Sequence, residues 1–144
     1  MRQHSDSTTV LIVDDDPQTA RLMLELLARK GIGARLATSK KAAIEALDRT
    51  SCDLAFLGTQ VTGDQDRSDA FELLGAIREV APEMPVVMMA KASDTGNDSG
   101  LLHRSARTAV RAIQSGCRDF LLKPLDRRVV EGVLDAALPN RRVA

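Results

Sequence analysis

The sequence predicts a single α/β domain with a doubly wound parallel sheet covered by helices on both faces. Five short apolar runs alternate along the chain with five longer stretches whose apolar residues recur at helical spacing. Right-handed crossovers between parallel strands place such helices on the two faces of one sheet. A length of 144 residues fits one domain of this kind.

The first half of the chain carries three predicted strands and two predicted helices. Asp16 is a helix N-cap, and Pro17 is the first helical residue, where the missing N–H of proline has no cost. The helix ends in two cations and Gly31. Ser39 caps the second helix. The predicted strands cover residues 10–13, 32–37 and 54–57.

The second half continues the same alternation. A third helix around Leu74 ends before Pro82, and a fourth covers residues 108–114. An amphipathic helix over residues 126–138 ends the domain. The predicted strands cover residues 85–90 and 117–122.

The carboxyl edge of the predicted sheet is where a functional crevice is expected, because ligands bind there in open α/β folds. Two polar loops, residues 59–69 and 91–105, leave this edge and break the rhythm of the chain. Four further residues stand at strand ends on the same edge: Asp14, Gly58, Ala90 and Lys123.

Composition argues against several classes of function. Twenty basic and twenty acidic residues cancel, and three phenylalanines are the only aromatic residues, so direct nucleic-acid binding is not expected. No apolar run is long enough for a membrane span, and the first nine residues lack the apolar stretch of a signal peptide. We therefore expect a cytoplasmic location and no membrane contact. Cys52 and Cys117 are predicted to be buried thiols.

Four stretches of the sequence resemble the receiver domain of two-component response regulators, over about residues 9–138. They are VLIVDDDP, DLAFL, PVVMMA and TAVRAIQSGCRDFLLKPLD. The last is most similar to receivers attached to enhancer-binding transcription activators. The resemblance implies a flavodoxin-like (βα)5 fold with strand order 2-1-3-4-5. Residues 1–8 are then expected to be a disordered tail, and residues 139–144 a tail or the start of a linker.

The resemblance also implies a role for each matching residue. In receivers an acidic pair and an acceptor aspartate bind Mg²⁺, and a lysine helps to neutralise the phosphoryl group that a histidine kinase supplies. Asp14 and Asp15 match the acidic pair, and Lys123 matches the lysine. Phe120 takes the position of the aromatic switch residue. The bond before Pro124 matches one that is commonly cis in the family.

Two positions depart from the pattern of the family. Gly58 stands where the acceptor aspartate belongs, and Ala90 stands where a Ser or Thr belongs. Glycine has no carboxylate to phosphorylate, and alanine cannot hydrogen-bond a phosphoryl group. The predicted function is therefore an atypical receiver that is not an enzyme and acts as a phosphorylation-independent regulatory or dimerisation module, in transcription control.

The expected partners are a protein or an attached output domain. A homodimer is expected to use the face formed by the fourth helix, the fifth strand and the fifth helix, which residues 108–114 and 126–138 help to supply. Whether a histidine kinase acts on the chain is left open.

Several alternatives remain open. An active phosphoreceiver could use a non-standard acceptor among three loop aspartates, and a flavodoxin-like cofactor binder is disfavoured by the acidic cluster after the first strand. Asp14 and Asp15 either retain weak Mg²⁺ binding or serve as anions at a helix N-terminus; no other cofactor is expected. Lys123, with Lys91 as an auxiliary cation, is expected to neutralise them. The loop aspartates are Asp64, Asp66 and Asp69.

Overall fold

The computed structural model describes residues 8–59, 70–91 and 101–138, with the side chains of residues 101–106 and 108 left out. Strands and helices alternate strictly through these ranges. The strands are β1 (Thr9–Val13), β2 (Gly33–Ala37), β3 (Leu54–Gly58), β4 (Val86–Lys91) and β5 (Asp119–Lys123). The helices are α1 (Pro17–Arg29), α2 (Lys40–Arg49), α3 (Ala70–Val80), α4 (Leu101–Gln114) and α5 (Arg127–Ala137).

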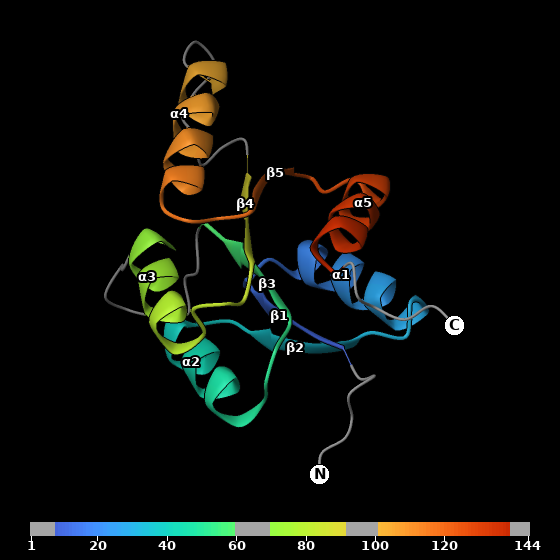
Figure 1. Cartoon of the computed structure of the whole chain (residues 1–144). Helices are drawn as coiled ribbons and strands as arrows, with labels where there is room; N and C mark the ends of the chain where they lie inside the picture. The colour runs from blue at the N-terminus through green and yellow to red at the C-terminus, as the bar shows by residue number, and fades with distance from the viewer. Residues whose placement is uncertain (1–7, 60–69, 92–100, 139–144) are drawn as a thin grey trace.

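The five strands form one parallel sheet in the order β2-β1-β3-β4-β5, which confirms the predicted fold and strand order. Helices α1 and α5 lie on one side of the sheet, and α2 and α3 lie on the other (Figure 1). β1, β3 and most of β4 are buried on both faces, as expected for strands inside a doubly wound sheet. The carboxyl ends of all five strands therefore meet at one edge.

The core consists of two apolar clusters, one on each face of the sheet. Ile12 and Phe56 belong to the cluster that packs against α1 and α5, whereas Leu11 and Leu57 belong to the cluster under α2 and α3. Side chains alternate between the two faces along a strand. Full burial of such a side chain stabilises the fold by about 1.5–3 kcal/mol. The same alternation decides which residues meet at the strand ends.

Capping side chains fix where three of the helices begin. Asp16, Ser39 and Asp126 occupy N-cap positions, and each accepts a hydrogen bond from a backbone N–H two or three residues further on. These bonds satisfy donors that have no partner inside the helix. The predicted caps at Asp16 and Ser39 are confirmed.

The start of α4 differs from the prediction. The helix was expected over residues 108–114 after a loop at 91–105, but α4 begins at Leu101, and Lys91 is the last residue of β4. Residues 101–107 contain no glycine or proline and are rich in leucine, arginine and alanine, which form helices readily. The polar residues within this segment made it resemble a continuation of the preceding loop in the sequence. The rest of that expected loop, residues 92–100, lies outside the described residues, as do the three loop aspartates.

The C-terminal end of α4 is attached to α3 by two arginines. The guanidinium of Arg111 lies 3.8 Å from the centroid of the Phe71 ring, within the range of a cation–π contact. Arg78 donates from Nη1 to the carbonyl oxygen of Gly116, at 3.3 Å. Gly116 has a φ of +104°, a conformation that favours glycine. These contacts fix the turn that leads into β5.

Candidate functional site

The carboxyl edge of the sheet brings acidic and basic side chains together on one face. Asp14 and Gly58 continue the alternation of Ile12 and Phe56, which face α1 and α5. On β5, Lys123 lies two residues after Leu121 and therefore faces the same side of the sheet as Asp14 and Gly58. The strand register therefore directs the Lys123 side chain toward the acidic loop after β1.

Asp14 forms a buried ion pair with Lys123. The Asp14 residue is 1% exposed, and its Oδ2 lies 2.7 Å from Nζ of Lys123, whose side chain is 8% exposed. Oδ1 accepts a hydrogen bond from the backbone N–H of Asp16 at 3.0 Å. The 2.7 Å distance is typical of a charge-assisted hydrogen bond, but the approach of Nζ to Oδ2 does not have hydrogen-bond geometry. We therefore describe the contact as an ion pair that supplies the counter-charge of the carboxylate.

Asp16 contributes to this network as well as capping α1. One carboxylate oxygen accepts from the N–H of Gln18, and the other accepts from the hydroxyl of Thr19 at 2.8 Å. The second oxygen also lies 3.5 Å from Nζ of Lys123. The Thr19 hydrogen bond lowers the pKa of Asp16, helped by the charges of Lys123 and Lys91 and opposed by burial. The sequence predicted only the cap, because proximity to Lys123 depends on the fold.

Gly58 lies directly beneath the Asp14 carboxylate. A β-carbon built on Gly58 would stand 2.6 Å from Oδ2 and 2.9 Å from Cγ of Asp14. No real side chain tolerates such distances, so one of the two groups would have to move. The backbone of Gly58 is outside the left-handed region. Glycine at this position therefore provides space for Asp14.

Lys91 brings a second cation to the same edge. It pairs with Lys123 in the register of β4 and β5. Both lysines line a cleft of about 470 Å³ beside the N-terminus of α1. The cleft is lined by Asp16, Gln18, Thr19, Leu22, Lys91, Lys123, Pro124 and Leu125.

The two predicted switch positions lie on the opposite face of the sheet. Phe120 is half-buried and packs against the cluster on the side of α2 and α3. Ala90 is buried, and the alternation along β4 directs it to that side as well. Asp15 is half-buried next to Asp14, and the Lys123–Pro124 peptide bond is cis. The acidic pocket and the switch positions are thus separated by the sheet.

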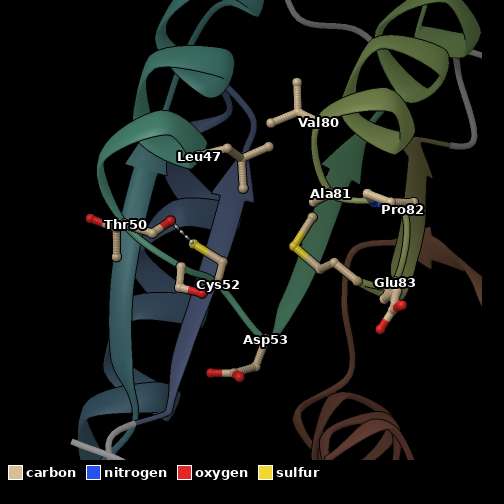
Figure 2. Close-up of a pocket in the computed structure, with 10 residues that line it drawn as sticks. Leu47, Thr50, Cys52, Asp53, Val80, Ala81, Pro82 and Glu83 are labelled. Carbon is tan, nitrogen blue, oxygen red and sulfur yellow. Dashed lines mark hydrogen bonds between the residues drawn. The ribbon is translucent and has the colours of Figure 1, made fainter. Parts of the chain in front are cut away.

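A second pocket, of about 490 Å³, lies at the other end of the sheet, where α2 and α3 end (Figure 2). Cys52 lines it, with its Sγ 3.8 Å from the carbonyl oxygen of Thr50. Burial raises the pKa of the Cys52 thiol, and the charge of Asp53 adds to this effect. A neutral thiol is a poor nucleophile. The Cys52 thiol therefore lacks the thiolate character of a reactive cysteine.

The two cysteines differ in how far they are buried. Cys117 is buried, as predicted, and burial raises its pKa to about 11. Cys52 is half-buried, so the prediction is correct for it only in part. Both thiols are free.

Comparison with known proteins places this fold and site in a family. The model of the response regulator receiver domain matches residues 10–135. The chain is 36% identical to the nitrogen assimilation regulatory protein NtrX of Azorhizobium caulinodans over 93% of its own length and 27% of that protein. It is 28% identical to the transcriptional regulatory protein ZraR of Escherichia coli O157:H7, over 96% of this chain and 28% of that one.

Solved structures agree with this placement. The receiver domain of NtrX from Brucella abortus superposes with a TM-score of 0.76 at 31% identity, over 90% of this chain and 98% of that one. A two-component response regulator from Clostridium difficile superposes with a TM-score of 0.75 at 27% identity, over 95% of this chain and all of that one. The chain belongs to the response regulator receiver domain family. It spans about a quarter of the length of the curated relatives that it matches.

The Mg²⁺ ion that this family implies does not fit the arrangement of side chains. Mg²⁺ demands octahedral oxygen coordination with several waters. Oδ2 of Asp14 faces an ammonium instead, and residue 58 supplies no carboxylate. Within the described part of the chain, no three His, Cys, Asp or Glu side chains are grouped to hold a metal ion.

The helices described in the structure include none with the length and apolar character needed to cross a membrane.

We predict that Lys123→Met lowers the free energy of unfolding by roughly 3–5 kcal/mol, because it leaves the Asp14 carboxylate buried without a counter-charge. Arg127→Met is the matched control. It breaks an exposed ion pair with Glu25, at 3.8 Å, and should cost less than about 1 kcal/mol. Urea unfolding of both variants measures the difference, and equal losses would contradict the assigned role of Lys123.

Proposed function

We propose that this chain is an atypical receiver that regulates a transcription-related output through protein contacts, without accepting a phosphoryl group and without enzymatic activity. The observation that carries this proposal is the pairing of Asp14 with Lys123 directly over Gly58. The carboxylate that would bind the metal ion and the ammonium that would neutralise a phosphoryl group are thereby committed to each other.

Phosphotransfer needs an acceptor carboxylate beside the acidic pair. At the end of β3 the chain offers Gly58, and the space above it is filled by the Asp14 carboxylate. Asp14 is itself a poor substitute acceptor, because it is 1% exposed and a phosphodonor could not reach it. Ala90 would give no hydroxyl to hold a phosphoryl group. These features together support a receiver that does not depend on phosphorylation.

The names of the relatives support a role in transcription. NtrX and ZraR are named as regulatory proteins, and this chain corresponds to only about a quarter of each. We infer that the receiver regulates an output domain, whether that domain is attached or separate.

An apolar face provides a surface for such contacts. Four large hydrophobic side chains on α4, β5 and α5 are between 45% and 54% exposed. Contiguous apolar exposure marks protein–protein interaction sites, and β5 is an edge strand of the sheet. A second copy of the chain is the proposed occupant, because one surface of this kind can pair with itself around a two-fold axis. The four residues, called here the α4–β5–α5 face, are Val110, Ile113, Leu122 and Val129.

We predict that acetyl phosphate or beryllofluoride with Mg²⁺ leaves the chain unmodified, since the acceptor is missing and Lys123 is engaged by Asp14. Intact-mass spectrometry and ¹⁹F NMR provide the measurement. A receiver that retains its acceptor aspartate, treated in parallel, shows that the reagents are active. A stable adduct on any aspartate of this chain would overturn the proposal in favour of an active phosphoreceiver with a non-standard acceptor.

We predict that Ile113→Lys weakens self-association at least tenfold, because placing a charge in an apolar contact costs more than the ~1.4 kcal/mol that corresponds to a factor of ten. Leu36→Lys is the matched control, since Leu36 is 44% exposed on the edge strand β2, away from this face. Sedimentation equilibrium measures both dissociation constants. A wild-type chain that stays monomeric, or equal effects of the two variants, would refute the dimer.

A further inference from the structure

The position of the Asp14 carboxylate depends on the absence of a side chain at residue 58. Its Oδ2 and Cγ occupy the volume where a β-carbon of residue 58 would stand, at 2.6 and 2.9 Å. From that position the carboxylate meets Lys123 on one side and the backbone N–H of Asp16 on the other. Both of its oxygens are therefore engaged within the chain.

The positive charge in this pocket comes from the chain itself. Nζ of Lys123 lies 2.7 Å from Asp14 and 3.5 Å from Asp16, so one ammonium faces two carboxylates. An ammonium is a compact, strongly hydrated cation with three donors, and in this pocket two carboxylates replace part of its water shell. A divalent ion here would need several water ligands, and the Asp14 residue is only 1% exposed while its carboxylate lies over Gly58.

We propose that Gly58 makes this pocket a built-in cation site, in which the Lys123 ammonium takes the place of a divalent ion, and that any β-carbon at residue 58 opens the site to Mg²⁺. This inference rests on the proposed function and traces it to one missing atom, the β-carbon of residue 58. Gly58 acts as a positioning residue: its missing side chain determines where the Asp14 carboxylate lies.

A β-carbon at residue 58 has a defined consequence. Because the Asp14 carboxylate is the end of a flexible side chain, it can rotate away without disturbing the strands. Rotation that moves Oδ2 away from residue 58 breaks the 2.7 Å contact with Lys123 and releases the carboxylate for another cation. Two neighbouring carboxylates at an open strand end are suitable ligands for Mg²⁺. The loss of the ion pair and the gain of the metal are thus two results of one movement.

The first test compares Mg²⁺ binding by wild type, Gly58→Ala and Gly75→Ala. Gly75 lies in α3 with nothing within 4 Å of an added β-carbon, so it controls for the chemical change alone. Isothermal titration with MgCl₂, against NaCl of equal ionic strength, provides the measurement. We expect at least tenfold tighter Mg²⁺ binding by Gly58→Ala than by wild type or Gly75→Ala. Equal affinity in all three proteins would overturn the proposal.

The second test isolates the contact between residues 58 and 14. Gly58→Ala should lower the melting temperature in the wild-type background and leave it unchanged in the Asp14→Ala background, where no carboxylate occupies the space. Equal changes in both backgrounds would show that Gly58 does not act through Asp14. Alanine cannot be phosphorylated, so this cycle is independent of phosphotransfer. An adduct on another aspartate would refute the proposed function and leave this inference intact.

Discussion

Burial of the Asp14 carboxylate is the constraint on which the carboxyl edge of the sheet depends. A charge taken out of water costs several kcal/mol unless a counter-charge and hydrogen bonds replace the lost hydration. Here the ammonium of Lys123 and the N–H of Asp16 perform this task, at 2.7 and 3.0 Å. The parallel register brings Lys123 to the site, and Gly58 leaves the space that the carboxylate needs. An ion pair on one face of the sheet thereby holds the Asp14 carboxylate at this edge.

The division of the sheet into two faces separates this pocket from the two switch positions. The ion pair faces α1 and α5, whereas Phe120 and Ala90 lie toward the other cluster. In a phosphorylated receiver the two sides communicate through a hydroxyl residue and an aromatic residue. Ala90 has no hydroxyl with which to do so. The α4–β5–α5 face is therefore expected to be available for contacts without a signal from the pocket, which suits a module that binds constitutively.

Much of the fold could be predicted from sequence because its signals are local. Asp16 and Ser39 are capping residues with recognisable neighbours, and the buried strands are short apolar runs between turns. The start of α4 was missed because histidine, arginine and serine surround its first apolar residues, although Leu102 and Ala106 stand at helical spacing before Val110 and Ile113. The absence of a side chain at Gly58 was visible in the sequence, but its contact with Asp14 was not, because it depends on side-chain positions across two strands. The second role of Asp16 escaped for the same reason.

The most direct test of the central claim is a crystal structure of the chain grown in a high concentration of MgCl₂. The account predicts that the Asp14 carboxylate still lies over the Cα of Gly58, with Nζ of Lys123 within hydrogen-bond distance and no metal between them. A hydrated Mg²⁺ held by Asp14 and Asp15, with Lys123 turned away, would contradict it.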